Sequence, residues 1–481
     1  MQKLSVKKNY LYNVAYQILT LLVPFITTPY VSRVLGADGV GAYSYSYTIS
    51  SYFALFGVLG TNVYGQQIVA QHQDDENKRS EDFWEINIIR LLCTFLCLVI
   101  YLVFTFNARE NRNLLLILSV TILANVFDIS WFFQGMENFR IVVVRNAIVK
   151  LITTIGIFVL IKEKDDLALY VACLAFSTLA GNISFWFYIK GNIQRPVINC
   201  YNLKKHFCQT VVYFIPQVAY HIYGAVDKLM IGVITKSSFE NGYYEQAHKI
   251  INMLITIIAS LNIVMRSRIS YLIGQNNTSE IKKSISFSYK FFCLISFPLM
   301  LGLLFCAEEF VPVFFGEGYD EVKVILKLFI PIIFATGLNN LLGIQYLTPI
   351  GKQGRCNIVL IIAAIVNIIM NVVLIPRYKS IGATIASVTA ETIVAAVYVV
   401  MSKEILSYKE LLNGIVKYGV SSVVMGLAVY SVGFWHIKSM TMTLACKILV
   451  GFITYTIILL FLKDELAWTG ISQCKMKVKG K

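Results

Sequence analysis

Charged side chains are scarce in this chain of 481 residues. Asp, Glu, Lys and Arg together make up 14% of the sequence, whereas 57% of the residues are hydrophobic, and the mean hydropathy is +0.66. Soluble domains average roughly 25% charged residues. The composition therefore argues against a water-soluble fold and indicates a protein that is embedded in a membrane.

Several motifs that carry chemistry are also missing. The sequence has no Gly-rich loop ending in Lys and Ser or Thr, no HExxH motif and no CxxC pair among its ten cysteines. It has no polar segment long enough for a nucleotide-binding domain, and its largest predicted outer loop, 307–323, is short and carries five acidic residues. These absences argue against ATP hydrolysis, a metal or disulfide framework and an embedded polymerase or sugar transferase. No enzyme activity and no cofactor are expected.

Long apolar stretches recur along the chain, and a membrane-spanning helix needs about 20 mostly apolar residues. The sequence predicts an all-α integral membrane fold of about fourteen transmembrane helices. The predicted spans lie near 10–32, 41–62, 84–106, 113–134, 142–161, 167–189, 207–234, 243–265, 287–306, 324–345, 356–375, 380–402, 412–436 and 442–462. We expect two six-helix lobes, 1–195 and 205–403, followed by an extra helix pair at 412–462.

The distribution of Lys and Arg predicts the orientation. An even number of spans puts both termini on one side, and roughly 23 Lys and Arg lie at the termini and in loops on that side, against about 10 in the opposite loops. We therefore expect both termini and the loop 190–206 to be cytoplasmic. This bias and contact with anionic headgroups account for the net charge of +15, so membrane lipids are expected partners and nucleic acid is not.

The two predicted lobes resemble each other. A Gly-x-Tyr pattern occurs at Gly41 and again at Gly242, and Arg-x-x-Ile-Val-x-x-Ile occurs from Arg145 and from Arg355, at similar shifts of about 200 residues. Because each lobe holds an even number of helices, the two copies have the same orientation, as in transporters built from parallel repeats. The repeat therefore favours alternating access between two lobes.

Ionisable residues fall within or beside the predicted spans, where a central charge costs about 2.5 to 3.5 kcal/mol. They include Arg90, Asp128, Arg145, Lys150, Asp227, Lys228, Glu245 and Lys249. We expect a hydrated cavity lined by these residues.

For several of them a structural role is an alternative. Arg145 lies near a span end, from which its side chain can reach the interface. The pairs Asp227 with Lys228 and Glu245 with Lys249 could stabilise a lobe without substrate contact. Arg90 and Lys150 lie deeper, and we interpret them as groups for an anionic passenger, Arg through bidentate phosphate contacts and Lys as a point charge.

Four motifs, spread over nearly the whole chain, carry a resemblance to a known family. They are Pro24-x-x-x-x-Pro29-Tyr-x-Ser-Arg33-x-Leu-Gly36, Asp128-x-x-Trp-Phe-Phe-Gln134-Gly-x-Glu137, Asp227-Lys228-x-Met-Ile-Gly232 and Gly242-Tyr-Tyr-Glu245-x-Ala-x-Lys249-Ile. Together they resemble the Wzx-type oligosaccharide flippases, which share a superfamily with the lipid II flippases and the MATE drug exporters.

The resemblance implies a two-lobed cavity in the bacterial cytoplasmic membrane. The cavity would take an undecaprenyl-pyrophosphate-linked sugar unit from the cytoplasmic leaflet, present it outside, and add Arg33 to the candidate lining residues. It further implies a cation gradient or the membrane potential as the driving force, and polysaccharide polymerase machinery as a partner. The alternatives are a MATE-like drug and cation antiporter, which needs an acidic, aromatic-lined pocket, and a membrane-embedded polysaccharide polymerase.

Overall fold

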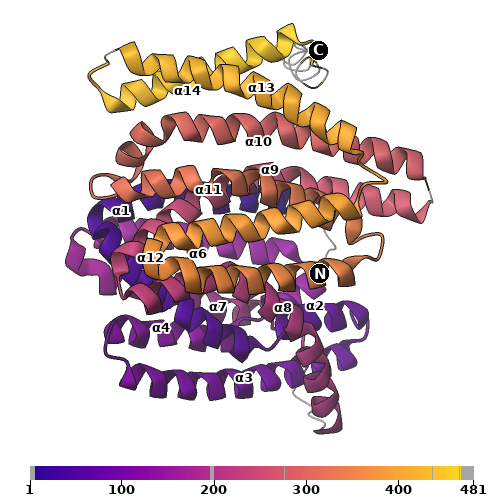
Figure 1. Ribbon diagram of the computed structural model, residues 1–481. Coiled ribbons are helices and arrows are strands. Elements are labelled where there is room, and N and C mark those ends of the chain that lie inside the picture. The colour runs from indigo at the N-terminus through magenta and orange to yellow at the C-terminus, as the bar shows by residue number, and fades with distance from the viewer. Residues whose placement is uncertain are drawn as a thin grey trace. The chain divides into compact units, whose positions relative to one another are not determined.

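The computed structural model describes residues 6–194, 200–275, 277–435, 437–464, 466 and 468, and the regular structure in this part of the chain is helical throughout (Figure 1). The chain divides into two compact units, Met1–Gly242 and Tyr243–Lys481. Each unit is built from long helices that pack against their neighbours, and each is described by itself.

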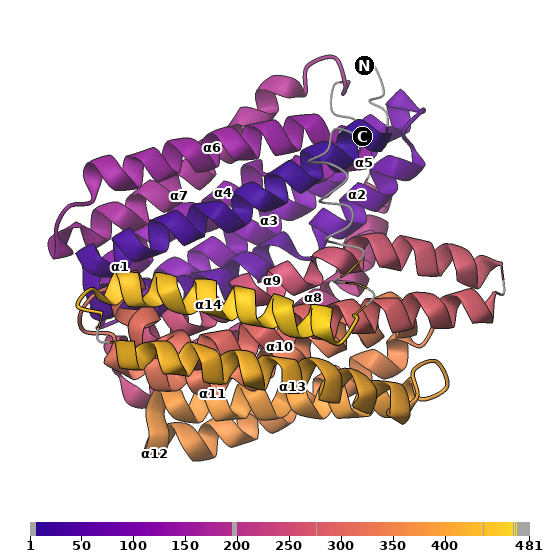
Figure 2. The same ribbon diagram turned by 90° about the horizontal axis from the view of Figure 1, so that it is seen from above.

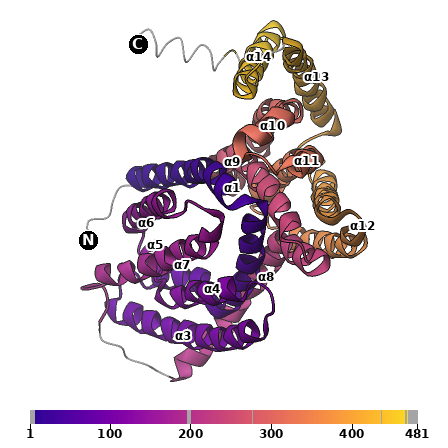
Figure 3. The same ribbon diagram turned by 90° about the vertical axis from the view of Figure 1, so that its left-hand side faces the viewer.

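The first unit consists of eight described α-helices. They are α1 (Val6–Val58), α2 (Thr61–Gln71), α3 (Glu76–Asn107), α4 (Arg112–Ala124), α5 (Ser130–Gly135), α6 (Phe139–Leu160), α7 (Leu167–Ser184) and α8 (Cys200–Thr235). Helix α1 contacts α3, α4 and α6, while α7 packs between α4 and α6. Figure 2 shows α1, α6 and α7 lying alongside one another, and Figure 3 shows the same group from another side.

Helix α1 bends at Gly36, which has a φ of 68°. This left-handed backbone conformation is available to glycine without a steric penalty. The bend separates the predicted spans 10–32 and 41–62, so one continuous helical segment contains two predicted crossings.

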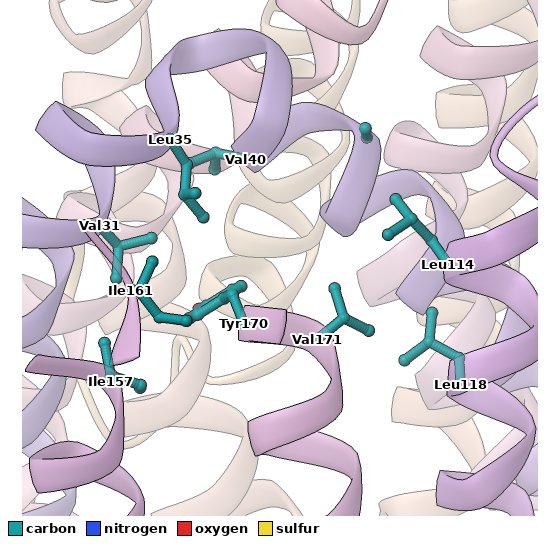
Figure 4. Packing of buried hydrophobic residues seen from close by; sticks show 10 residues of the cluster. Val31, Leu35, Val40, Leu114, Leu118, Ile157, Ile161, Tyr170 and Val171 are labelled. Atoms are coloured by element: carbon teal, nitrogen blue, oxygen red, sulfur yellow. The ribbon is translucent and has the colours of Figure 1, made fainter. Parts of the chain in front are cut away.

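A hydrophobic cluster holds this bend against the ends of neighbouring helices (Figure 4). Val31, Leu35 and Val40 of α1 pack with residues of α4, α6 and α7, namely Leu114, Leu118, Ile157, Ile161, Tyr170 and Val171. The Tyr30 hydroxyl donates to the carbonyl oxygen of Ile161 at 2.5 Å. The cluster therefore fixes where α1 passes α6 and α7.

Two glycines let the start of α9 (Ser238–Gly274) approach α1 closely. A Cβ atom at Gly41 would collide with the carbonyl oxygen of Ser238, and one at Gly242 would collide with the carbonyl oxygen of Ala37. These are the glycines of the repeated Gly-x-Tyr pattern. Backbone approaches backbone at this crossing, which explains why both positions lack a side chain.

The second unit contains the remainder of α9 and five further described α-helices. They are α10 (Thr278–Phe315), α11 (Asp320–Asn339), α12 (Gln353–Met401), α13 (Tyr408–Val432) and α14 (Met440–Phe461). A π-helical segment, Asn340–Leu347, continues α11, and α12 bends at Lys379, whose φ is 51°. Helices α13 and α14 pack against each other and against α10.

The predicted all-α membrane fold is confirmed. Most predicted spans coincide with a helical stretch, some of them continued by a short 3-10 or π segment, whereas 113–134 is interrupted at Asp128 and Ile129 and 41–62 extends past the end of α1 into the turn before α2. Within the described residues, nine helices are long and apolar enough to cross a membrane, and the first and α12 each contain two predicted spans.

The boundary between the compact units falls at Gly242, after α8, whereas the sequence analysis separated the lobes at 195–205. Helix α8 contacts α1, α2 and α3 of the first unit. The division into two repeated lobes and an added helix pair stays a prediction.

Candidate functional site

A polar cavity of about 390 Å³ lies between α1, α6 and α7 of the first unit. Its polar lining comprises Thr27, Arg145, Asn146, Lys150, Thr153, Thr154, Tyr170, Ser177, Thr178 and Asn182. The α6 residues recur at three- and four-residue intervals, so the helix presents them on one face. The residues of α7 that line the cavity recur at the same three- and four-residue intervals.

Lys150 lies at the middle of α6, 11 residues after Phe139 and 10 residues before Leu160. At about 1.5 Å per residue, its backbone is roughly 15 Å from either end of the helix. The side chain is half-buried, and Nζ donates to the carbonyl oxygen of Thr20 at 3.5 Å. No ion pair of Lys150 occurs within the described part of the chain, so a mid-membrane cation faces the cavity.

The sequence explains why Lys150 contacts the carbonyl oxygen of Thr20. The carbonyl of Thr20 would ordinarily accept from the amide four residues later, but that residue is Pro24, which has no N–H. The proline leaves this oxygen without its helical donor, and the lysine from α6 supplies a charged one. Pro24 therefore lines the cavity and also leaves free the Thr20 carbonyl oxygen that Lys150 contacts.

Arg145 is held at the end of the cavity near the C-terminus of α7. Its Nε donates to Ser184 Oγ at 3.1 Å, and one terminal nitrogen donates to Asn182 Oδ1 at 3.0 Å. The guanidinium also contacts Asn146 Oδ1 and lies 4.0 Å from the ring centroid of Phe185. These hydroxyl and amide groups orient the guanidinium at the edge of the cavity.

Among the described residues, the lining thus contains two cations and no Asp or Glu. Hydroxyl and amide groups make up the rest of its polar surface, and these can donate to or accept from a ligand. Such a site favours an anionic, hydroxyl-rich ligand and lacks the carboxylate that a pocket for cationic drugs needs.

Arg90 and Asp128 come together elsewhere in the first unit. One terminal nitrogen of Arg90 lies 3.5 Å from Asp128 Oδ2, and the side chains are 0% and 19% exposed. The other terminal nitrogen donates to Asn62 Oδ1 at 2.9 Å. Arg90 does not reach the cavity in this structure.

The remaining candidates do not line the cavity either. In the first unit, Arg33 is exposed near the bend of α1, and near the end of α8 Asp227 is buried while Lys228 is half-buried. In the second unit, Lys249 Nζ lies 3.4 Å from Glu245 Oε1. Substrate contact by these residues stays a prediction.

Sequence analysis missed the contribution of α7. Ser177, Thr178 and Asn182 line the cavity but carry no charge, and they interrupt an apolar helix with small polar groups. The four-residue interval between Thr178 and Asn182, which places both on one side of the helix, is the signal that would have indicated them.

Comparison with known proteins agrees with the fold and the motifs. The family model described as "Polysaccharide biosynthesis protein" matches residues 6–266, more than half of the chain, and the MatE model matches residues 213–373. A "Putative O-antigen transporter" of Escherichia coli (strain K12) is 24% identical over 402 residues, which cover 82% of this chain and 96% of that protein. The capsular polysaccharide biosynthesis protein CapF of Staphylococcus aureus is 21% identical over 417 residues, covering 83% and 99%.

Solved structures share the architecture at low sequence identity. The lipid II flippase MurJ in an inward closed conformation aligns with a TM-score of 0.74 and 19% identity, covering 95% of this chain and 99% of that one. An inward-facing MATE family multidrug transporter aligns with a TM-score of 0.59 and 13% identity, covering 82% and 94%. The resemblance read from the four sequence motifs is confirmed, and the chain belongs to the family of polysaccharide biosynthesis proteins.

Proposed function

We propose that the protein is a flippase for a lipid-linked oligosaccharide. It moves a sugar unit carried on undecaprenyl pyrophosphate from the cytoplasmic to the outer leaflet, by alternating access, for assembly of a cell-surface polysaccharide. The observation that carries the proposal is the cavity between α1, α6 and α7, in which Arg145 and Lys150 face hydroxyl and amide groups without a carboxylate.

The chemistry of the cavity suits the head region of such a passenger. A guanidinium binds phosphate oxygens through paired hydrogen bonds, and an ammonium group acts as a compact point charge. Thr153, Thr154 and Asn182 offer hydrogen bonds to sugar hydroxyls. A cation in the middle of a membrane is energetically costly. Binding of an anionic passenger would explain why a lysine is found at position 150.

The names of the relatives support the same function. The Escherichia coli relative is described as an O-antigen transporter, the Staphylococcus aureus relative is named for capsular polysaccharide biosynthesis, and the structurally similar MurJ is a lipid II flippase. The passenger of this chain would then belong to the lipid-linked glycans, and polysaccharide polymerase machinery would receive the product. A bacterial cytoplasmic membrane with both termini on the cytoplasmic side fits this route and the Lys and Arg asymmetry.

The MATE-like antiporter alternative receives less support. A pocket for cationic drugs needs negative charge, and the lining residues of this cavity include two cations and no acid. An electrostatic mismatch of this kind disfavours a cationic ligand by placing like charges together.

Reconstituted vesicles test the proposal. The purified protein is placed in liposomes loaded with radiolabelled undecaprenyl-pyrophosphoryl N-acetylglucosamine, and the sugar that becomes accessible to external periodate is measured over time. We expect faster exposure than in protein-free vesicles. Exposure at the protein-free rate, combined with transport of a cationic dye such as ethidium, would refute the flippase and favour the antiporter.

A further inference from the structure

The guanidinium of Arg145 lies in a seat that the end of α7 builds at one end of the cavity. The seat consists of Gly181, Asn182, Ser184 and Phe185, which surround the point where α7 ends. Arg145 itself belongs to α6. The position of this cation in the cavity therefore depends on a second helix and on whatever holds that helix in place.

Gly181 and Phe185 give the seat its shape. The guanidinium carbon lies 4.0 Å from the centroid of the Phe185 ring, a distance at which a cation and an aromatic face attract each other. Phe185 is 1% exposed, and its ring stacks on that of Phe133 at a centroid distance of 5.7 Å. A Cβ atom at Gly181 would lie 3.0 Å from Nη2 of Arg145. A side chain at position 181 would therefore displace the guanidinium.

Asn182 holds one edge of the guanidinium and is itself held by α4. Its Oδ1 accepts from Arg145 Nη2 at 3.0 Å, while its Nδ2 donates to the carbonyl oxygen of Ala124 at 2.9 Å. Ala124 ends α4, and the amide of Asp128, which would be its helical donor, donates to the Asn125 carbonyl instead.

This arrangement fixes the orientation of the Asn182 amide. A reversed amide would set Nδ2 against the N–H groups of Arg145 and Oδ1 against the Ala124 carbonyl oxygen, so both hydrogen bonds would become repulsive contacts. The amide oxygen of Asn182 is therefore directed toward Arg145 by the end of a third helix.

Ser184 holds another part of the guanidinium in the same manner. Its hydroxyl accepts from Arg145 Nε at 3.1 Å and donates to the Gly181 carbonyl oxygen at 2.6 Å. The hydroxyl hydrogen is thus directed to the backbone of α7, which leaves an oxygen lone pair for Arg145. A side chain that is already oriented loses less entropy when it binds a ligand.

The second cation of the cavity is held more loosely. Lys150 lies five residues further along α6, about 7.5 Å along the helix axis, and its Nζ donates to the Thr20 carbonyl oxygen at 3.5 Å, which is long for a hydrogen bond. Its ammonium group is a point charge on a flexible stem. The cavity therefore combines one oriented guanidinium with one adaptable ammonium group.

We propose that Asn182 is a positioning residue which, together with Gly181, orients the Arg145 guanidinium toward a phosphate group of the passenger. A guanidinium binds a phosphate through two parallel N–H···O bonds, so its plane must be correctly oriented, whereas an ammonium group has no such requirement. The seat sets that plane. This role rests on the proposed flippase function, which supplies the phosphate.

Binding of geranyl diphosphate, a short-chain lipid diphosphate, tests this role. Its affinity is measured for the full-length protein in nanodiscs, with geraniol as the uncharged reference and correction for uptake by protein-free nanodiscs. We expect Asn182→Ala and Arg145→Lys each to weaken diphosphate binding about tenfold, and the double variant to bind within about twofold of either, because without a guanidinium the amide has nothing to orient. Geraniol binding should not change.

The matched control is Asn107→Ala. The Asn107 side chain also donates to a carbonyl oxygen, that of Val103, but it lies at the exposed end of α3. This variant should bind the diphosphate with wild-type affinity.

Gly181→Ala separates positioning from folding. Alanine is favoured over glycine inside a helix, so the melting temperature should stay near that of the wild type. The added Cβ should displace the guanidinium and weaken diphosphate binding. The same substitution in the Arg145→Lys background should leave the affinity unchanged.

Wild-type affinity of Asn182→Ala, or losses that multiply in the double variant with Arg145→Lys, would overturn the positioning role and leave the flippase proposal standing. If Asn182→Ala does not fold, Gly181→Ala decides, and wild-type affinity of that variant would overturn the role. A wild-type protein that binds geranyl diphosphate no more tightly than geraniol would overturn both proposals, because the cavity would then not be an anion site.

Discussion

Arg90 and Asp128 form an ion pair in which the arginine side chain is fully buried and the aspartate side chain is 19% exposed. The guanidinium of α3 lies 3.5 Å from the carboxylate that follows the turn after α4, and it also binds Asn62 of α2. The backbone amide of Ser130 donates to the second oxygen of Asp128 at 3.0 Å. The pair therefore connects α2, α3 and the start of α5, and the burial of Arg90 favours a structural role over the predicted contact with a passenger.

Removing one member of this pair should destabilise the protein. Arg90→Ala leaves Asp128 without its cation, and breaking a buried ion pair costs about 3 to 5 kcal/mol. Because Asp128 retains some exposure, we expect the lower part of this range, with less protein in membranes and a lower melting temperature in detergent. The double variant Arg90→Met with Asp128→Asn should recover most of the loss. Wild-type stability of Arg90→Ala with reduced transport would instead favour a role in passenger binding.

Lys150 should matter for transport and little for stability. Lys150→Met removes the mid-membrane cation but keeps an apolar stem of similar length, so we expect normal abundance and at least a tenfold fall in lipid-linked sugar transport, which corresponds to about 1.4 kcal/mol.

The matched control is Lys162→Met just after the end of α6, where the exposed side chain donates to the Phe158 carbonyl at 2.5 Å. It should transport at the wild-type rate. An equal fall in both variants would mean that the loss reflects total positive charge rather than the cavity.

The crossing of α1 and the start of α9 should tolerate no side chain. Gly242→Ala would drive Cβ into the Ala37 carbonyl, and overpacking of a tight contact costs about 1 to 3 kcal/mol. We expect a lower melting temperature in detergent. Gly224→Ala, on α8, has no neighbouring atom within 4 Å and should melt like the wild type or slightly above it. Equal melting of the two variants would contradict the close approach.

The orientation can be checked with single cysteines in a cysteine-free background. A cysteine at Asn202 should resist a membrane-impermeant thiol reagent in intact cells and react after the cells are opened, because the 190–206 loop is predicted to be cytoplasmic. A cysteine at Gly318, which is exposed on the opposite predicted side, should react in intact cells. The reverse pattern would invert the topology. The chain ends themselves, 1–5 and 469–481, lie outside the described residues.

Much of the architecture follows from composition and spacing. Hydropathy alone predicted the helical spans because each crossing needs a run of apolar residues whatever its neighbours are. The spacing of Arg145, Asn146, Lys150 and Thr154 along α6 likewise predicts one polar face, since helical periodicity depends only on local geometry.

The sequence determined that α6 carries a polar face around a mid-membrane lysine, but tertiary structure decided what that face meets. Lys150 reaches the Thr20 carbonyl that Pro24 leaves free, and the uncharged residues of α7 complete the cavity. Arg90 looked equivalent to Lys150 in hydropathy, yet packing placed it beside Asn62 and Asp128. His206, at the start of α8, drew no attention in the sequence because the groups beside it, on Tyr64, Asp82 and Glu85, are more than 100 residues away. Whether a buried charge meets a cavity, a counter-ion or another polar group depends on contacts between distant segments, which local periodicity does not encode.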